Sequence, residues 1–572
     1  MIERLHHRGW HYTLLLGIGA IMFLLNLGGA TLWDVDEGRN AECAYEMMQA
    51  DNWIVPTFNS KLRVDKPALL YWLQIFAYNL FGVHEFSARL PSALAALATV
   101  LLAYELARAM FTRTTGLLAG VIVATTPMLC GAARFANPDA LLNVCIVLTM
   151  TVFWLGLRDR PWWWFGLLGI SSGLAVLAKG PVGIVLPGAI AMGFLAWERR
   201  WDIAWDWRWF LTCWAFVLTA LPWYLWVGAE TKGEFLVGFL WRHNVERGTS
   251  AMENHHGFPG YYLVVLLVGT APWSIFLGVA AWFGFWSTIR EPWDRFRALW
   301  DGSTPERETR ADTDPALTDR TAAYRFLACW IVVFLLFFSV AATKLPNYVL
   351  PTVVPCALVV ARFLQRWRTH SLEVPEWIAQ VGVFSLLLIG VAVSAGLTIA
   401  GGVGNLAVMR GRVFPGLEAW ALLGLGPVLG AALAWWFLRQ RQYSGVIVAV
   451  AVSAILLFGP LAASGSALFN RYKAPGALIA QMDSFSSDVD LRIGCWNLEH
   501  LPSLNFYVKR NIEHLADENA VRNFVSMRLP VYLFLPLADW ERLEKKLDTN
   551  LRVIARHHDM YHHTEVVVLT NR

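Results

Sequence analysis

The sequence predicts an all-α polytopic membrane domain of about thirteen transmembrane helices, followed by a small C-terminal α/β domain outside the membrane. Of the 572 residues, 56 % are hydrophobic and only 16 % are charged. Soluble domains carry about 25 % charged residues, so a single apolar core does not account for the deficit. Apolar stretches of about 20 residues, long enough to cross about 30 Å of hydrocarbon, recur along the chain. Residues 467–572 instead show short alternating strand-like and helical patterns.

We expect the membrane domain to cover residues 1–466. The first span has no charge over 12–32 and no small-residue cleavage site after it, so we interpret it as a retained helix rather than a signal peptide. The expected spans are 11–32, 88–108, 115–131, 139–157, 162–178, 181–197, 209–228, 260–286, 325–342, 346–364, 376–400, 416–438 and 444–466.

Two long loops interrupt the spans, at 33–87 and 229–259. The first contains two short amphipathic patterns, 39–50 and 67–81, which predict helices that lie on the membrane rather than cross it. In the C-terminal domain we expect strands at 491–496, 531–535, 551–555 and 565–569, and helices at 475–482 and 539–547.

The distribution of arginine predicts the orientation, because cytoplasmic loops are rich in Lys and Arg. Arginines precede the first span and follow the second, fourth, sixth, tenth and twelfth, and all fall on one side if the N-terminus is cytoplasmic. The charged stretch 290–325, interpreted as a flexible loop, falls on that side too. An odd number of spans then places the C-terminal domain outside, which in a bacterial inner membrane is the periplasm.

Other features limit the class of function. The formal charge of +4 does not indicate a nucleic-acid partner, and thirty Trp residues fit the interfacial belts of a membrane protein. The seven cysteines contain no C-x-x-C pair, so neither disulfides nor a cysteine zinc site is expected. We find no Walker loop and no convincing dinucleotide fingerprint, so no nucleotide site is predicted.

Basic residues gather in the loops that should be external and poor in Lys and Arg. Charges at membrane depth usually mark a polar cavity, and Arg and Lys together suit an anionic ligand such as a phosphate on a lipid carrier. For any single residue, headgroup binding and snorkelling is an equally good interpretation. The group comprises Arg39, Lys61, Arg63, Lys66, Lys179, Arg242, Arg247 and Lys344.

Carboxylates and histidines lie beside these bases. Asp36 and Glu37 follow the first span, and Asp139 opens the fourth. For Asp139 a helix-capping role and a functional role are equally good interpretations. The cluster Glu253-Asn254-His255-His256 could ligate a metal, although a loop His pair is more often plain polar surface.

Eight short stretches in the first two-thirds of the chain carry a resemblance to a known family: 36–42, 52–57, 65–67 with 71–72, 138–139, 179–181, His255 before 261–262, 271–273, and 344–348. In this order along about residues 10–370 they resemble the polyprenyl-phosphate-sugar glycosyltransferases of the aminoarabinose transferase and protein O-mannosyltransferase type. Residues 504–510 fit the same family. The match is closest to the branch that includes the lipid A aminoarabinose transferases. The fold that this resemblance implies is the membrane glycosyltransferase fold called GT-C.

The resemblance also implies roles for residues. It puts Asp36 in the position of the first-loop catalytic carboxylate and Asp139 in that of a second important aspartate, with Glu37 as the next candidate. Asp65 and His255 match metal-binding positions, for zinc or magnesium. Two departures are visible: Asp65 stands where the family usually has Glu, and Pro259-Gly260 replace aromatic residues. The expected donor-phosphate ligands are Arg39, Lys66, Lys179, Arg247, Lys344 and Tyr348.

The expected activity is therefore transfer of a sugar from a polyprenyl-phosphate donor to an envelope acceptor, with lipid A, another glycolipid and protein Ser/Thr as open alternatives. A lipid or sugar transporter is the rival from another class, since intramembrane charges suit it equally. Transporters more often show repeated halves and broken helices at the midplane. Because this chain concentrates its charges in external loops and shows no internal repeat, the enzyme is favoured.

Overall fold

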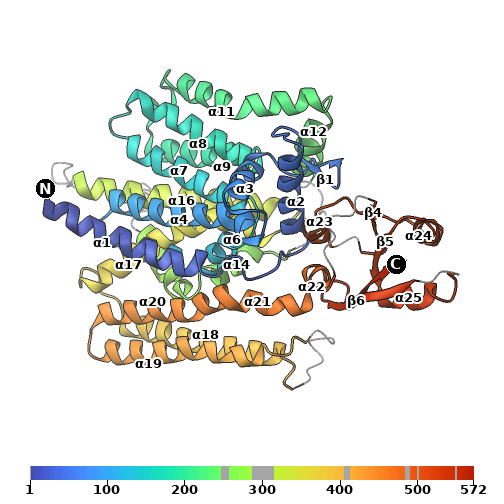
Figure 1. Ribbon diagram of the computed structural model, residues 1–572. Helices are drawn as coiled ribbons and strands as arrows, with labels where there is room; N and C mark the ends of the chain where they lie inside the picture. Colours follow the sequence, from blue (N-terminus) through green and yellow to red (C-terminus); the bar gives the residue numbers. More distant parts are fainter. Residues whose placement is uncertain are drawn as a thin grey trace.

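The computed structural model describes residues 2–246, 257–286, 315–404, 413–482, 490–498, 501–547 and 551–571. A bundle of helices makes up most of the molecule, and a small α/β region covers one end of it (Figure 1). The N-terminus lies at the opposite end of the bundle from this region. The two termini therefore lie at opposite ends of the bundle.

The first helix is followed by the elements of the first long loop, where the amphipathic patterns predict two helices. Both expected helices are confirmed as α2 and α3, and a short antiparallel hairpin between them, which pairs Thr57 with Leu62, is an addition. The elements are α1 (Ile2–Gly19), η1 (Ala20–Leu24), α2 (Asp36–Gln49), β1 (Thr57–Phe58), β2 (Lys61–Leu62) and α3 (Leu69–Phe81).

The bundle continues with long apolar helices joined by short helical turns. In chain order they are α4 (Glu85–Met110), α5 (Arg113–Ala124), α6 (Pro127–Ala133), α7 (Asp139–Gly156), α8 (Trp162–Lys179), α9 (Val182–Glu198), α10 (Trp201–Ala204), α11 (Trp209–Glu230), α12 (Glu234–Leu236), η2 (Val237–Glu246), α14 (Tyr261–Gly269), η3 (Trp273–Phe276), α16 (Pro315–Val340), η4 (Pro346–Thr352), α17 (Val353–Arg368), α18 (Glu376–Ala400), η6 (Glu418–Gly424), α19 (Leu425–Arg439), α20 (Tyr443–Pro460), η7 (Leu461–Gly465), α21 (Ser466–Leu468) and η8 (Phe469–Tyr472).

Within the described residues, eight helices are long and apolar enough to cross a membrane, or up to ten if each of two bent pairs counts as one span. The pairs α5–α6 and α14 with Trp273–Trp286 bend by 63° and 116°. Shorter apolar helices account for two more expected spans, at Gly9–Leu24 and Val182–Glu198. The chain is thus a multi-span membrane protein. One expectation was wrong, because residues 315–325 belong to helix α16 rather than to a flexible loop.

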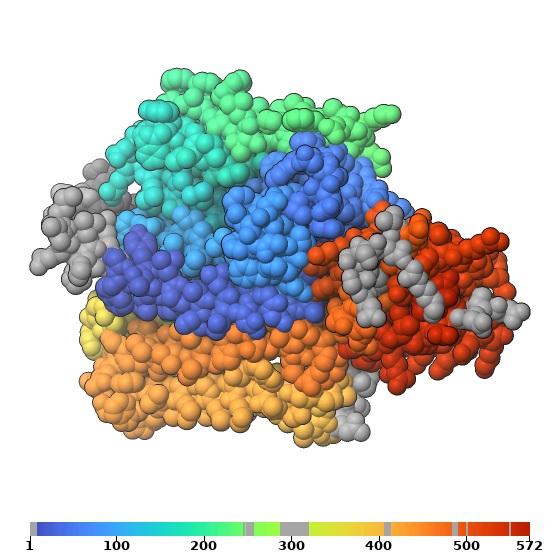
Figure 2. Space-filling view, viewed as in Figure 1, coloured from blue at the N-terminus to red at the C-terminus, as the bar shows by residue number. Residues whose placement is uncertain are grey.

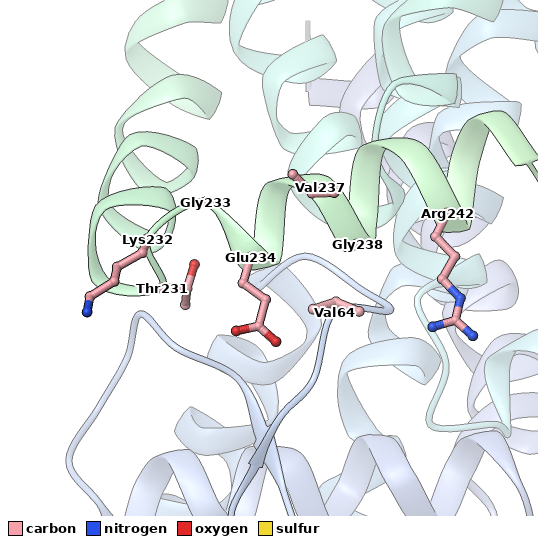
Figure 3. Close-up of a pocket in the computed structure, with 8 residues that line it drawn as sticks. All are labelled: Val64, Thr231, Lys232, Gly233, Glu234, Val237, Gly238 and Arg242. Atoms are coloured by element: carbon pink, nitrogen blue, oxygen red, sulfur yellow. The ribbon is translucent and has the colours of Figure 1, made fainter.

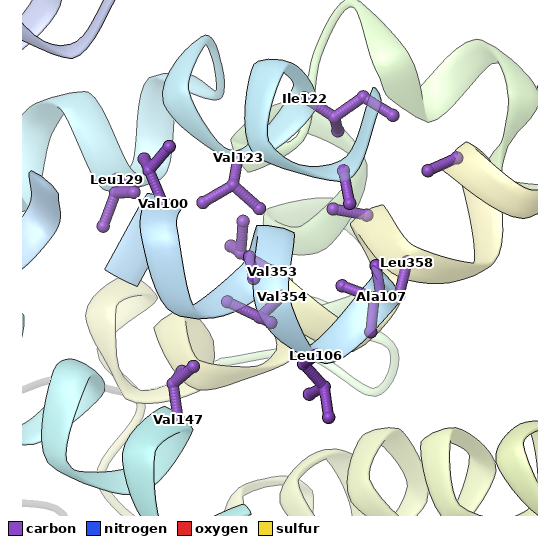
Figure 4. Close-up of a cluster of buried hydrophobic side chains, with 14 of the residues drawn as sticks. Val100, Leu106, Ala107, Ile122, Val123, Leu129, Val147, Val353, Val354 and Leu358 are labelled. Carbon is purple, nitrogen blue, oxygen red and sulfur yellow. The ribbon is translucent and has the colours of Figure 1, made fainter. Parts of the chain in front are cut away.

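The core of the bundle lies where α4, α5, α7 and α17 meet (Figure 4). Val100, Val123, Val147 and Val354, one from each helix, are at most 1 % exposed. Helix α17 is central: in the segment Pro346–Arg368, which contains it, 89 % of the most apolar stretch is buried. In α18 only 17 % of the most apolar stretch is buried. The apolar faces left exposed on such peripheral helices are the surfaces that lipid would cover.

The C-terminal α/β region, which we define as residues 473–571, contains a five-stranded sheet of order β4-β3-β5-β7-β6. β3 pairs in parallel with β4 and β5, and the β5–β7 and β7–β6 pairs are antiparallel. The four expected strands and two expected helices are confirmed, while α23, α24 and β4 are additions. The elements are α22 (Ala474–Ala480), β3 (Arg492–Cys495), α23 (Ser503–Val508), β4 (Glu513–His514), α24 (Glu518–Val525), β5 (Val531–Pro536), α25 (Leu537–Leu543), β6 (Arg552–Asp559) and β7 (Thr564–Thr570).

Figure 2 shows this region, in orange-red and red, pressed against the blue first-loop elements. The contact between them bears directly on the candidate site.

Candidate active site

A buried ion pair anchors the start of α2. One guanidinium edge of Arg89 on α4 binds Glu37 in a bidentate manner, with Nε–Oε1 and Nη2–Oε2 distances of 2.7 Å. The backbone N–H groups of Trp33 and Ala136 also donate to this carboxylate, each at 2.8 Å. Glu37 is 0 % exposed and Arg89 2 %. Every strong interaction of Glu37 is therefore directed into the protein, and it joins α2, α4 and the segment before Asp139.

A second buried side chain, Asn40, joins the same segments from one turn further along α2. Its Nδ2 donates to the Ala136 carbonyl at 2.9 Å, and its Oδ1 accepts from Nη2 of Arg63 at 2.8 Å. Residues 36–40, 63–66 and 136–139 are thus held together by polar contacts in the interior. These are the three segments that carry Asp36, Asp65 and Asp139.

Asp36 and Arg39 differ from this buried pair because their side chains are accessible. Asp36 is exposed in the first turn of α2 and lies within electrostatic reach of Arg63. Arg39 is half-buried, and within the described residues its side chain makes no hydrogen bond or ion pair. A carboxylate and a guanidinium on one turn are therefore both available to a ligand.

Asp139, at the first position of α7, is 6 % exposed. One carboxylate oxygen is in an ion pair with Nζ of Lys179, and the other accepts from Nδ2 of Asn347 at 2.6 Å. The helix-capping interpretation gains no support, since these oxygens are taken by side chains from α8 and η4. Lys66 acts on Asp139 electrostatically, and Nζ of Lys179 lies 5.3 Å from the ring centroid of Tyr348. Lys66, Lys179 and Tyr348 thus come together around Asp139.

Asp65 lies between a histidine and an arginine. Its Oδ1 is 3.1 Å from Nε2 of His243 in η2, and its Oδ2 is 3.4 Å from Nε of Arg63. Burial alone would raise the pKa of Asp65, but the hydrogen bond from His243 and the charge of Arg63 hold that pKa well below its usual range. Asp65 is therefore ionised whenever the protein is folded at neutral pH.

His243 is a residue that sequence reasoning missed. Its only signal was its place beside Arg242 in the second long loop. The predicted metal ligand His255 and the predicted phosphate ligand Arg247 lie outside the described residues. No group of three or more His, Cys, Asp or Glu side chains in the described ranges is close enough to hold a metal ion.

Lys344 is engaged elsewhere. Its Nζ donates to the carbonyls of Ser339 at 2.7 Å and of Ala341 at 3.1 Å, at the end of α16. It also lies 5.8 Å from the ring centroid of Tyr262. Lys344 thus stabilises a helix C-terminus, where a cation is favourable. Among the described residues, its hydrogen bonds go to the end of α16 and not to the Asp139 group.

An open cavity of about 620 Å³ is lined by sequence neighbours of Asp65 and His243, although not by these two residues themselves (Figure 3). Val64, the neighbour of Asp65, forms one wall, and Arg242, the neighbour of His243, lies on the other. Lys232 and Glu234 line the same space. A volume of this size falls in the range of small-molecule sites, about 300–1,000 Å³.

Comparisons with known proteins find relatives both in sequence and in fold. The sequence model of the family described as dolichyl-phosphate-mannose-protein mannosyltransferase matches residues 65–226. A protein of Enterobacter sp. (strain 638), named undecaprenyl phosphate-alpha-4-amino-4-deoxy-L-arabinose arabinosyl transferase, is 30 % identical over 384 residues, which is 65 % of this chain and 63 % of that protein. A protein of the same name from Shewanella sediminis is 26 % identical over 506 residues, 87 % of this chain and 84 % of the relative.

A further relative in Pseudomonas fluorescens, arabinosyl transferase 2, matches over only 60 % of its own length. Among solved structures, ArnT from Cupriavidus metallidurans bound to undecaprenyl phosphate superposes with a TM-score of 0.76 at 21 % identity, covering 99 % of this chain and 98 % of that one. That likeness establishes the fold. The chain is thus similar in sequence to transferases of these names over about two thirds of their length or less at 30 % identity, and it shares the fold of the ArnT structure.

Proposed function

We propose that the chain is a membrane glycosyltransferase that moves a sugar from a polyprenyl-phosphate donor to an envelope acceptor, with lipid A as the first candidate. The observation that carries this proposal is the group of cations, Lys66 and Lys179, around Asp139, beside the accessible Arg39 and Asp36. The donor class is supported by relatives named for an undecaprenyl-phosphate sugar and by a similar structure that contains undecaprenyl phosphate.

The reaction breaks the bond between the sugar anomeric carbon and the donor phosphate oxygen, and the bonding electrons leave with the phosphate. An acceptor oxygen forms the new bond to the same carbon. Negative charge builds on the departing phosphate, so Arg39 and Lys66 would bind it most strongly as the bond breaks, the effect that usually contributes most to catalysis. Arg39 suits this role because its guanidinium can grip two phosphate oxygens at once.

Asp36 is our proposed catalytic carboxylate. With a hydroxyl acceptor it accepts the proton that the acceptor loses as the new bond forms. With a lipid A phosphate as the acceptor no such proton needs removal, and Asp36 then positions the acceptor or stabilises positive charge on the sugar. Its exposure in the first turn of α2 is what either role requires.

Asp139 and Glu37 take different roles from Asp36. We propose Asp139 as a positioning residue that holds Lys179 and Asn347 at the site, because both of its oxygens are occupied by them. Glu37 is likewise a positioning residue, since its carboxylate is fully engaged by Arg89 and two backbone N–H groups.

A divalent metal fits the site in part. Asp65 and His243 offer one carboxylate oxygen and one imidazole nitrogen, a donor set that suits zinc better than magnesium. Catalytic zinc sites have three protein ligands as a rule, so two require further ligands such as phosphate oxygens. When bound, the ion would supply positive charge at the leaving phosphate. We propose Asp65 and His243 as its ligands, and His255 remains a prediction from sequence.

The site is proposed to face the periplasm of a bacterial inner membrane. Support comes from the arginine-rich loops, which place the N-terminus in the cytoplasm, and from the position of the candidate site at the end of the bundle opposite the N-terminus (Figure 1). Labelling of a cysteine introduced at Ser303 should require a permeabilised membrane, while one at Ser486 should react from outside. The reverse pattern would overturn this orientation.

Protein is the second candidate acceptor, favoured by the match of residues 65–226 to the protein mannosyltransferase family. Purified protein in nanodiscs with polyprenyl-phosphate sugars should glycosylate either lipid A or a Ser/Thr peptide, which mass spectrometry distinguishes. Comparison of lipid A and envelope glycans from cells with and without the gene identifies the natural acceptor. Absence of both donor binding and transfer to either acceptor would reject the proposal.

A further inference from the structure

The segment that leads into α2 is held by the C-terminal α/β region, more than 430 residues away in the chain. Nζ of Lys473 donates to the Thr31 carbonyl at 2.6 Å. The N–H of Leu32 donates to the hydroxyl of Tyr507 at 2.8 Å, and the N–H of Asp34 to that of Tyr561 at 3.0 Å. Three successive parts of this backbone are therefore tied to one external region.

The Asp34 side chain continues these contacts. Its Oδ1 accepts from the backbone N–H of Ser503 at 2.7 Å, and its Oδ2 accepts from the Ser503 hydroxyl at 2.6 Å. Both bonds are made at the start of α23. Two hydrogen bonds from one serine to one carboxyl group make this a two-point link between the two regions.

Helices α2 and α23 also touch at the level of the backbone. A Cβ placed on Gly38 would lie 2.5 Å from the Ser503 nitrogen and 2.7 Å from its Cα. Real Cβ contacts of this length essentially do not occur, so the close approach requires glycine at position 38. Tyr507 of the same helix donates to Glu85 at 2.9 Å, which fixes α23 against the start of α4.

Asp36 and Arg39 therefore share their helical turn with Gly38, one side of which is bound by α23. The Glu37–Arg89 pair binds the same turn through the preceding residue. Because a misplacement of about 1 Å can cost on the order of 10²-fold in rate, the two sets of contacts together decide whether these accessible side chains can act. The family match ends at residue 226 and assigns no role to α23.

We infer that the C-terminal α/β region is a positioning element of the active site, with Ser503 as the positioning residue that holds Asp34 and, through it, the first turn of α2. The inference rests on the proposed function only where transfer activity is measured. Its structural half, that Ser503 orders residues 36–40, is testable whether or not the transferase assignment is correct.

The test compares Ser503→Ala, Ser503→Thr and Gly38→Ala with Ser526→Ala as the matched control. Ser526 is exposed in the same region, and its hydroxyl bonds only to the Asn523 carbonyl within the described residues. Hydrogen exchange of the full-length protein in nanodiscs reports order in α2, and single-turnover transfer with a separate donor-binding measurement reports function.

We expect Ser503→Ala and Gly38→Ala to exchange faster at residues 36–40 and to transfer at least about tenfold more slowly, with donor affinity changed less than about threefold. Ser503→Thr, which keeps the hydroxyl, should restore most of the rate, and Ser526→Ala should match the wild type. A second variant, Asp34→Asn, should add little to Ser503→Ala, because both remove the same link.

Unchanged exchange at α2 in both Ser503→Ala and Gly38→Ala would overturn the inference, as would faster exchange with a wild-type transfer rate. If the wild type itself transfers no sugar, the proposed function fails, and the exchange comparison still decides whether Ser503 orders α2. Equal slowing by Ser503→Thr and Ser503→Ala would also count against the inference, since it would indicate a packing effect rather than the hydroxyl bond.

Discussion

Asp139 and Lys179 form an ion pair between the first residue of α7 and the last residue of α8, and neither side chain is exposed. Asn347 donates to the same carboxylate at 2.6 Å. Removal of one partner of a buried pair leaves the other charge uncompensated, at a cost of about 3–5 kcal/mol. Loss of the Lys179 charge should therefore affect both the stability of the bundle and the proposed binding of the donor phosphate.

This coupling gives the first prediction. Lys179→Met and Asp139→Asn should each lower the melting midpoint, and the double variant should recover part of the loss because no unpaired charge remains. Donor affinity should fall in every variant that lacks Lys179 and less in Asp139→Asn. Lys344→Met is the matched control, since Lys344 bonds to the end of α16, and it should leave donor affinity unchanged. Strictly additive losses of stability would contradict a direct pair.

The second prediction concerns the donor phosphate. Arg39→Ala and Lys66→Ala should weaken binding of polyprenyl phosphate and reduce transfer to the background level, while the protein stays folded in detergent. A charge-assisted bond to phosphate is worth about 1.5–3 kcal/mol, so each loss should weaken binding by roughly 10- to 150-fold. Lys61→Ala, at an exposed position of β2, should bind and transfer normally. Normal donor affinity in both test variants would remove the basis for this site.

The third prediction concerns the metal. Zinc bound per mole of protein, measured by elemental analysis in the presence of polyprenyl phosphate, should fall in His243→Ala and in Asp65→Asn. His370→Ala serves as control, because His370 is exposed and its ring lies against Tyr443, at 5.0 Å between centroids. A His255→Ala variant tests the ligand that the resemblance suggests. Metal lost in His255→Ala but retained in His243→Ala would reverse our assignment.

The sequence was sufficient to predict the helical bundle and most of the C-terminal strands. A long apolar run and a period-two alternation can each be recognised from residues that are neighbours in the chain. α23 and α24 have six and eight residues, too few for a periodicity to stand out from chance. The hairpin at 57–62 has two residues in each strand and was missed for the same reason.

Side-chain pairing at the site was less predictable than the elements that carry it. Arg89 lies inside an apolar helix, and nothing in the sequence connects it with Glu37, 52 residues earlier. The same limit explains why His243 was missed as a neighbour of Asp65. The two residues are 178 positions apart, from 65 to 243, and only the fold brings them to 3.1 Å.

The fourth prediction separates catalysis from binding at Asp36. Asp36→Asn should bind the donor almost normally and transfer it at least about a hundredfold more slowly, because general-base help is worth typically 10²–10⁴-fold and is realised in the transition state. Asp51→Asn, an exposed substitution just after α2, should transfer at the wild-type rate. Single-turnover kinetics in nanodiscs measure both quantities. Wild-type turnover in Asp36→Asn would remove this assignment.

The last prediction is a pH dependence of stability that arises at Glu42, on the buried face of α2. Glu42 is 2 % exposed, and its Oε2 has no hydrogen-bond partner among the described residues. Burial, with a smaller contribution from Glu46, raises the pKa of Glu42 from 4.5 to about 8. The folded protein thus binds this proton more tightly than the unfolded chain does. Its contribution to stability is complete below pH 4.5 and is lost as the pH rises through about 8.

Glu42→Gln keeps the size of the side chain and removes the charge. Its melting midpoint should equal that of the wild type near pH 4.5 and exceed it at pH 9, by several degrees if about 1 kcal/mol shifts the midpoint of a domain by roughly 2–4 °C. Glu541→Gln, at an exposed position of α25, should show a difference that does not depend on pH. Because Glu42 lies two turns from the start of α2, a wild-type midpoint that falls no faster with pH than that of Glu42→Gln would mean that this carboxylate is solvated. In that case water would reach the buried face of α2, and α2 and α23 would pack less closely than the Gly38–Ser503 contact indicates.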